Sequence, residues 1–290
     1  MACSVPFNNK NLDISFFVFK PTIVIIDDLV HGLKAFSLTT ESLGCVQSSI
    51  FRSIHGNMCM IFLCLMNFNL FVFHVGFWTH EFMFMKNIYL SVNDNFRCHC
   101  SMIIWYGAWQ RRSSKEKEEL TSTLKSMLTS ISSMAVLIEH SFLEAYGGES
   151  RDGSSTAKFS TGDIISLNSA VTTTNDLNDL CYAVLAILRS RFAKMEGITA
   201  GLCFKGQSKP RVVCIHVWKS LHFCYCWILN SDHRKWMMPY LERFSIDMKY
   251  DIFRVVYVSG DNVVDLNCIS THQMLENGNE SSRQGQVMQN

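Results

Sequence analysis

The sequence predicts an α/β fold, with a mostly parallel sheet and long helices packed on it, interrupted by an apolar segment near 58–101. Buried strands are indicated by three runs rich in β-branched residues: Thr22–Ile26, Arg211–Val217 and Phe253–Val258. Apolar residues recur at steps of three and four in 115–146 and again from 177, as in amphipathic helices. Because strands and helices alternate along the chain, a parallel sheet is favoured.

Bulk properties restrict the class of protein. The chain has 290 residues, of which 48% are hydrophobic, so it can bury a large core. A formal net charge of +1 gives no field that would attract nucleic acid, and we find no strong nucleic-acid signal. Twelve scattered Cys and an opening without a signal-peptide pattern indicate a reducing compartment, so we expect a cytoplasmic protein.

The chain divides into four parts by composition: a first strand and helix in 1–57, an apolar segment in 58–101, the main helical and α/β part in 102–275, and a polar, disordered tail in 276–290. In the main part, the first helix has an apolar stripe at Leu120, Leu124, Met127, Ile131, Met134 and Ile138. A loop rich in Gly, Ser and Thr follows. The helix from 177 then ends before Gly197.

The apolar segment has three readings. Residues 53–80 contain no Asp, Glu, Lys or Arg, and 58–78 is long enough to cross a membrane. Asn67, Asn69 and His74 oppose that, since each is costly in hydrocarbon. We rank a foreign insertion or poorly ordered segment first, with the fold continuing from Asn57 into Met102. A single membrane span ranks second and a core helix third.

The strongest chemical signal is the acidic pair Asp27 and Asp28, which directly follows the predicted strand Thr22–Ile26. Carboxyl ends of parallel strands face the usual ligand crevice, and carboxylates bind Mg²⁺. Asp261 follows the strand Phe253–Val258 in a similar way. If the two strands are neighbours, the three carboxylates form a magnesium site; otherwise Asp27 and Asp28 cap a helix and Asp261 belongs to a turn.

The stretch IVIIDDLVHGLKAF locally resembles the first strand and helix of the response-regulator receiver family, in which an acidic pair follows a strand. That resemblance implies a phospho-accepting Asp after a second strand, and residues 50–80 contain no Asp. Two clusters of metal-ligand type occur elsewhere, His222 with Cys224 and Cys226, and Cys98-His99-Cys100. Neither has the paired spacing of a structural zinc site, so packing is favoured for both.

No complete catalytic constellation is present, which favours a non-catalytic scaffold or interaction protein. The apolar stripe of the 115–146 helix is then either a face for a protein partner or part of the core. One alternative is a magnesium-dependent enzyme acting on a phosphorylated or nucleotide ligand at Asp27, Asp28 and Asp261. The other is a single-pass membrane protein anchored by 58–78.

Overall fold

The computed structural model describes residues 2–54, 102–229, 243–244 and 247–260. The strands are β1 (Ala2–Pro6), β2 (Leu12–Pro21), β3 (Cys45–Ser53), β4 (Ile103–Gln110), β5 (Ala135–Ser150), β6 (Thr156–Ser160), β7 (Ile164–Val171), β8 (Ile198–Gly206), β9 (Arg211–Trp218) and β10 (Asp247–Val258). The helices are α1 (Ile26–Glu41), α4 (Ser114–Met127), α5 (Leu177–Phe192) and α6 (Leu221–Leu229), with a short 3₁₀ turn η1 (Leu128–Ile131).

Eight of the strands close into a barrel in the order β10-β3-β4-β2-β5-β8-β9-β7. Every neighbouring pair in the barrel is antiparallel. The predicted mostly parallel sheet is therefore wrong. Strands on either side of a helix do run the same way, but a third strand separates them: β4 lies between β2 and β3 and is antiparallel to both.

The barrel consists of two repeats. The first runs β2-α1-β3-β4-α4-β5 and the second β7-α5-β8-β9-α6-β10, and each has the strand and helix order of a ferredoxin-like unit. Two joints close the barrel, β5 on β8 and β10 on β3. At the first joint, Leu143 of β5 is opposite Ile14 of β2 on one side and Gly206 of β8 on the other. At the second joint, Phe253 of β10 is opposite Ile165 of β7 and Ser53 of β3 in the same way. These matching rows align the two repeats residue by residue.

Two of the predicted elements differ from the structure. Thr22 and Ile23 lie in the turn after β2, and the acidic pair belongs to the first turn of α1, where the helix dipole favours negative charge. The predicted helix 115–146 ends at Met127, continues as η1 and becomes strand β5 from Ala135. The sequence predicts one long helix because the apolar residues of 115–146 keep steps of three and four through the Ser-rich turn around η1. The helix from 177 and the strands at 211 and 253 are present as α5, β9 and β10.

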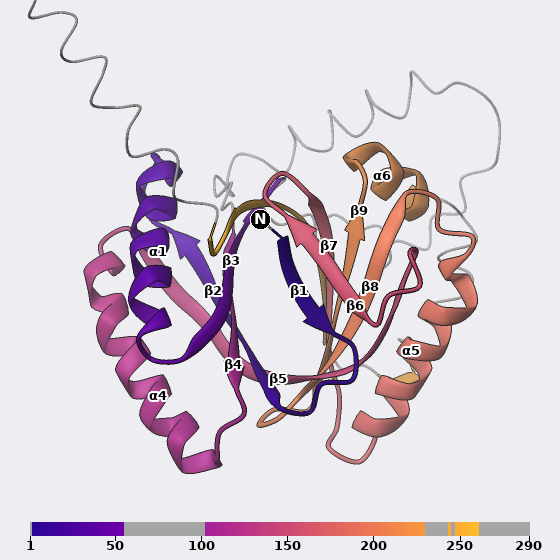
Figure 1. Ribbon diagram of the computed structural model, residues 1–290, viewed down its shortest axis with the longest axis horizontal. Coiled ribbons are helices and arrows are strands. Elements are labelled where there is room, and N and C mark those ends of the chain that lie inside the picture. Colours follow the sequence, from indigo (N-terminus) through magenta and orange to yellow (C-terminus); the bar gives the residue numbers. More distant parts are fainter. Residues whose placement is uncertain (1, 55–101, 230–242, 245–246, 261–290) are drawn as a thin grey trace, which may run out of the picture.

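The helices cover the outside of the barrel, α1 and α4 on one half and α5 and α6 on the other (Figure 1). Leu29, Leu33, Leu120, Leu124 and Ile131 pack with Trp105 and Trp109 of β4 in one core. Leu180 and Leu188 pack with Trp218 in the second core. The apolar stripe of α4 is thus largely buried at Leu120 and Leu124, although no observation tests the predicted protein partner.

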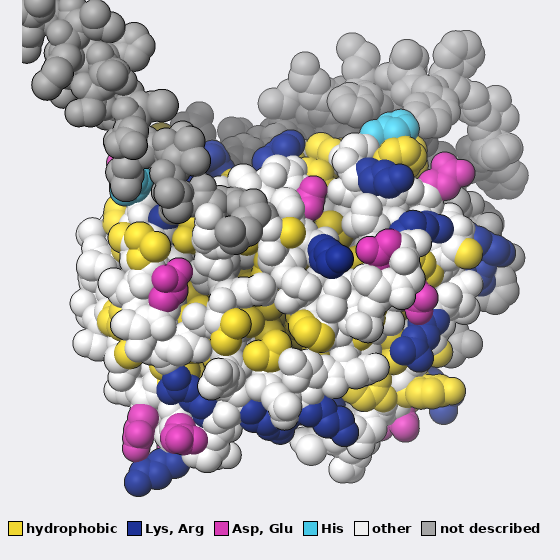
Figure 2. Space-filling view, viewed as in Figure 1, with side chains coloured by type: hydrophobic (Ala, Val, Ile, Leu, Met, Phe, Trp, Pro, Cys, Tyr) yellow, Lys and Arg dark blue, Asp and Glu magenta, His cyan; other side chains and the backbone are white. Residues whose placement is uncertain are grey.

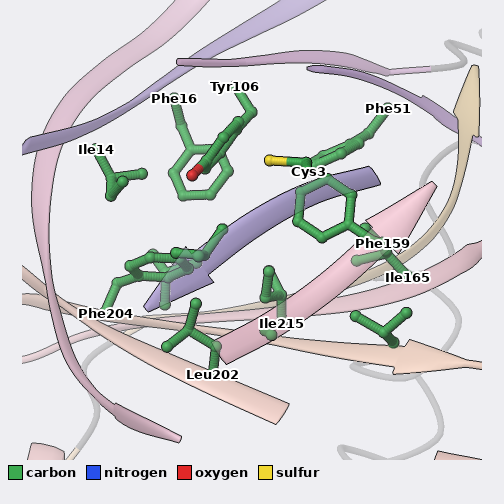
Figure 3. Packing of buried hydrophobic residues seen from close by; sticks show 14 of the residues in the cluster. Cys3, Ile14, Phe16, Phe51, Tyr106, Phe159, Ile165, Leu202, Phe204 and Ile215 are labelled. Carbon is green, nitrogen blue, oxygen red and sulfur yellow. The ribbon is translucent and has the colours of Figure 1, made fainter. Parts of the chain in front are cut away.

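The barrel lumen is a third core, and it contains the additional two-stranded sheet β1–β6 (Figures 1 and 3). Cys3, Val5 and Phe7 from the first strand and its following turn, with Ala157 and Phe159, pack among lumen-facing side chains of the barrel. Each repeat is preceded by one of these strands, and they pair antiparallel with Ser4 opposite Lys158. The lumen is therefore filled jointly by the side chains of its wall and by this strand pair. We call the pair the lumen hairpin, although β1 and β6 are not consecutive in the chain.

A buried ionic network ties the first repeat to the second. The carboxylate of Asp13 is fully buried, accepts hydrogen bonds from the Arg112 backbone N–H (2.8 Å) and Gln207 Nε2 (2.6 Å), and pairs with Lys117 Nζ at 3.0 Å. Lys117 also donates to Gln207 Oε1 at 2.6 Å. Because each charge has several partners, the network compensates for its desolvation.

The strands that flank 55–101 form a hairpin across that segment. Arg52 pairs with Ile103, and the Ser53 N–H donates to the Met102 carbonyl at 2.8 Å. The two described strand ends on either side of the segment are thus neighbours in the barrel. The segment 58–101 and the tail 276–290 lie outside the described residues, and the division of the chain into four parts stays a prediction.

Deleting residues 55–101 and joining Ile54 to Met102 through Asn-Gly is expected to leave the barrel folded, because the two strand ends are already hydrogen-bonded neighbours and Asn-Gly suits a tight hairpin. Thermal unfolding by circular dichroism is expected to stay cooperative. Loss of the cooperative transition would contradict the insertion hypothesis and show that the barrel requires the segment.

Replacing Asp13→Ala is expected to lower the free energy of unfolding by about 3–5 kcal/mol, since it leaves the Lys117 ammonium partly buried without its counter-charge. The matched control is Asp27→Ala, which removes an exposed ion pair with Arg52 at 3.0 Å and is expected to cost less than about 1 kcal/mol. Urea unfolding of the three proteins checks this. Equal effects of the two substitutions would contradict the assigned role of Asp13.

Candidate functional site

Two of the three predicted magnesium ligands lie in the described part of the chain. Asp27 and Asp28 lie in the first turn of α1, and Asp27 is 84% exposed at its side chain and pairs with Arg52. Asp261 lies outside the described residues. Among the described residues, no group of three His, Cys, Asp or Glu side chains is arranged to hold a metal. The strand-end argument for the site does not apply to an antiparallel barrel, so the three-carboxylate site stays an untested prediction.

The Cys and His cluster at 222–226 lies on a helix rather than a strand. His222 and Cys226 are one turn apart on α6, with Nε2 and Sγ separated by 3.5 Å on an exposed face. Cys224 points the other way, into the core. The three side chains therefore do not share a face. The cluster Cys98-His99-Cys100 lies outside the described residues.

The lumen wall carries an unusual row of side chains, Phe16, Tyr106 and Ser49, on adjacent strands β2, β4 and β3. The register places Tyr106 directly opposite Phe16 on one side and Ser49 on the other. We call this set the Tyr106 row. All three are buried, and the hydroxyl groups of Tyr106 and Ser49 have no hydrogen bond to a nitrogen or oxygen of the described chain. Their hydrogen-bond partner is the Cys3 thiol, which is a weak donor and acceptor, so the two hydroxyls still cost stability in this aromatic interior.

The second repeat shows that the fold does not require these hydroxyls. The alignment set by the closing joints makes Leu167, Ile215 and Leu202 the equivalents of Phe16, Tyr106 and Ser49. That second row is wholly aliphatic and lies in the same lumen core. Since Ile and Leu satisfy the same positions there, the polar groups of the Tyr106 row call for a functional explanation.

Aromatic rings pack around the Tyr106 side chain (Figure 3). The centroid of the Tyr106 ring lies 5.7 Å from that of Phe16, 6.1 Å from that of Phe51 and 6.0 Å from that of Phe159. These contacts are edge-on or stacked, as aromatic pairs prefer.

The first strand brings a thiol to the same place. Cys3 Sγ contacts Gln47 Oε1 at 3.3 Å, and the same oxygen accepts the Ser4 N–H at 3.1 Å. Burial raises the pKa of the Cys3 thiol to about 12, an effect that the Ser49 and Tyr106 hydroxyls only partly offset. Burial also raises the pKa of Tyr106 well above its usual value. Both groups are therefore neutral hydrogen donors at physiological pH.

A charged rim closes the opposite end of the lumen. By the alternation along β5, β9 and β10, the side chains of Glu139, Arg211 and Lys249 face the lumen. Arg211 forms an ion pair with Glu139, and Lys249 Nζ lies 4.0 Å from the same carboxylate. Phe7 packs at Gly148, at the far end of β5 from Glu139. The lumen hairpin and the charged rim thus occupy different ends of the barrel.

Comparison with known proteins identifies a partial family match and a shared fold. Residues 141–253 match a family described as a domain of unknown function (DUF7392), and no curated protein matches the chain. The structure resembles that of an anthrone oxidase-like protein, with 11% identity, a TM-score of 0.61, and coverage of 88% of this chain and 95% of the other. It also resembles a "putative monooxygenase" from Fusobacterium nucleatum subsp. nucleatum, with 6% identity, a TM-score of 0.51, and coverage of 85% and 93%.

These comparisons correct the predicted function. The predicted non-catalytic scaffold is contradicted, because the proteins that share this fold are named as an anthrone oxidase-like protein and a "putative monooxygenase". The α/β class is contradicted by the same likeness and by the antiparallel barrel. In the described part of the chain no helix is both long and apolar enough to cross a membrane, and the proposed anchor 58–78 falls outside that part.

Sequence reasoning missed the Tyr106 row entirely. Tyr106 lies in the aromatic run IIWYGAWQ and Ser49 in a Ser pair, and neither stretch carries a motif. The alternation of β4 does place Ile104, Tyr106 and Ala108 on one face. No signal in the sequence shows that this face lies inside a closed barrel.

The face shown in Figure 2 has hydrophobic side chains in the middle, and Lys, Arg, Asp and Glu are interspersed around them. No large field of a single sign is visible on this side. The interior of the barrel therefore offers a more distinctive site than this surface.

Because the Tyr106 and Ser49 hydroxyls have only the Cys3 thiol as a hydrogen-bond partner in this core, Tyr106→Phe and Ser49→Ala are each expected to change the free energy of unfolding by less than about 1 kcal/mol. Ser15→Ala is the matched control: Ser15 is fully buried, but its hydroxyl accepts the Trp109 Nε1–H at 2.8 Å, so its loss is expected to cost about 1–2 kcal/mol. Urea unfolding measures all three. A marked loss of stability in Tyr106→Phe would assign its hydroxyl a structural role.

Proposed function

We propose that this protein is an oxidoreductase that binds a flat, oxygen-bearing aromatic substrate in the barrel lumen beside the Tyr106 row. The observation that carries this proposal is the pair of buried hydroxyls of Tyr106 and Ser49, set among aromatic rings where the second repeat has only aliphatic side chains. The fold shared with an anthrone oxidase-like protein supports the reaction class.

The substrate oxygen would lie against the two hydroxyls. Tyr106 is neutral and therefore donates its O–H. The Tyr106 and Ser49 hydroxyls both hydrogen-bond with the Cys3 thiol, so we expect both to reach one acceptor oxygen that takes its place. For a substrate whose methylene group is conjugated with a ketone through an aromatic ring, as in anthrone, transfer of a methylene proton to a solvent base places negative charge on the ketone oxygen. Fixed donors in a dry site stabilise such charge strongly. This lowers the cost of forming the enolate, which then reacts with oxygen.

The reaction balances with dissolved oxygen as the oxidant. One atom of O₂ becomes the new carbonyl oxygen, and the other leaves as water with the two methylene hydrogens. The Cys3 thiol takes no part as a base at neutral pH, because burial raises its pKa to about 12. The residues of this chain bind the substrate, exclude water and hold the developing oxyanion.

The substrate needs space that the lumen hairpin now fills. Among the described residues, β1 has five register pairs with β6, two contacts with Gln47 and buried side chains at Cys3 and Val5. Its backbone is paired on one edge only, so we expect β1 to separate more easily than a barrel strand that is paired on both edges. We therefore expect the substrate to enter as β1 separates from β6.

Anthrone is the probe of choice for the test, with oxygen uptake and anthraquinone absorbance as the two readouts. Wild-type protein is expected to accelerate the oxidation, and Tyr106→Phe to lower the rate by on the order of 10²-fold, as for loss of one oxyanion donor. Ser49→Ala should also lower it.

The matched control is Ser48→Ala, because Ser48 neighbours Ser49 but lies on the opposite face of β3; its rate is expected to equal that of wild type. Two results would overturn the proposal: no acceleration by the wild type, or equal rates in wild type and Tyr106→Phe.

A further inference from the structure

Two buried thiols face each other outside the lumen, in the core beneath α5. Cys203 on β8 and Cys214 on β9 are direct partners in the register, and their sulfur atoms lie 3.2 Å apart. Cys203 is fully buried and Cys214 is 4% exposed. Neither belongs to the Tyr106 row, because both point to the outer face of the sheet, where they pack in the core of the second repeat.

We infer that Cys203 and Cys214 are a redox site that forms an intramolecular disulfide when the protein meets a hydroperoxide. Directly opposed residues on antiparallel strands have Cα atoms roughly 4.5–5.5 Å apart, which lies within the range that disulfides span. The sulfur atoms need to approach by only about 1 Å to reach bonding distance. The backbone therefore already has the required spacing.

The first repeat shows that two thiols are not needed for packing at this place. The equivalent cross-strand pair there is Ile50 opposite Trp105, in the core beneath α1. An aliphatic and an aromatic side chain fill that position in the first repeat, whereas the second repeat places two Cys side by side. Chemistry rather than volume distinguishes the pair.

The reaction proceeds in two balanced steps. The Cys203 thiol reduces the hydroperoxide ROOH to ROH and becomes a sulfenic acid, Cys203–SOH. The Cys214 sulfur then attacks the Cys203 sulfur, forming the S–S bond and releasing one water molecule. The oxidant is a hydroperoxide small enough to reach a buried core, and a dithiol reverses the reaction by exchange.

A third thiol makes the inference specific. Cys181 on α5 is buried in the same core as the pair. It comes from a helix, however, while Cys203 and Cys214 are locked opposite each other by the strand register. The disulfide is therefore expected between the two strands and not between strand and helix.

The test uses the full chain treated with hydrogen peroxide, followed by denaturation, alkylation and peptide mapping by mass spectrometry. We expect a linked pair of peptides containing Cys203 and Cys214, lighter by two hydrogen atoms than the reduced pair. The melting temperature is expected to rise by on the order of 5 °C and to return on treatment with dithiothreitol, because the cross-link restricts the unfolded chain.

Cys214→Ala is expected to abolish the link and the thermal shift, and the control Cys224→Ala, which removes a different buried thiol, is expected to retain both. Three results would overturn the inference: alkylation of both thiols after peroxide, a link from either to Cys181, or over-oxidation of Cys203 without a link. Should Cys214→Ala not fold, the peptide map of the wild type alone decides between these results.

Discussion

Closure of the barrel is the constraint on which the other features depend. The joints of β5 on β8 and β10 on β3 leave none of the eight barrel strands with a free edge. They also separate the interior from the helices outside, so that one set of alternating side chains on each strand faces a closed lumen. An eight-stranded barrel has an interior just wide enough for side chains or for one small ligand. Here the lumen hairpin occupies part of that space.

The two repeats use the same architecture for different chemistry. On the lumen side, the first repeat carries the hydroxyls of Tyr106 and Ser49, and the second carries Ile215 and Leu202. On the outer side the asymmetry is reversed, since Ile50 and Trp105 in the first repeat correspond to Cys203 and Cys214 in the second. In both cases the other repeat has Ile, Leu or Trp at the equivalent positions, so the fold itself does not require the hydroxyls or the thiols. Such local costs are typical of functional positions.

Part of the fold follows from local patterns. The helix α5 and the strands β9 and β10 were predictable because their periodicity and β-branched content agree with their tertiary environment. The run Thr22–Ile26 was misleading, because its β-branched residues suggest a strand while Asp27 and Asp28 favour the start of a helix, and the helix begins at Ile26. In β5, apolar spacing continued the pattern of α4, so no local signal marked the change to a strand.

The site was beyond sequence reasoning for a different reason. Tyr106 and Ser49 are 57 positions apart in the chain, and only the register of β3 with β4 makes them neighbours. The network of Asp13 with Gln207 likewise depends on the return of the chain after β8. Pairings of this kind are set by barrel closure rather than by any short motif.

Hydrogen exchange of β1 with and without anthrone tests the central claim most directly, because the Tyr106 row accepts a ligand only if the lumen hairpin opens. We expect the probe to accelerate amide exchange in Ala2–Pro6 and Thr156–Ser160, while exchange in β2 and β4 is unchanged or slower. Unchanged or increased protection of β1 at saturating probe would contradict binding in the lumen.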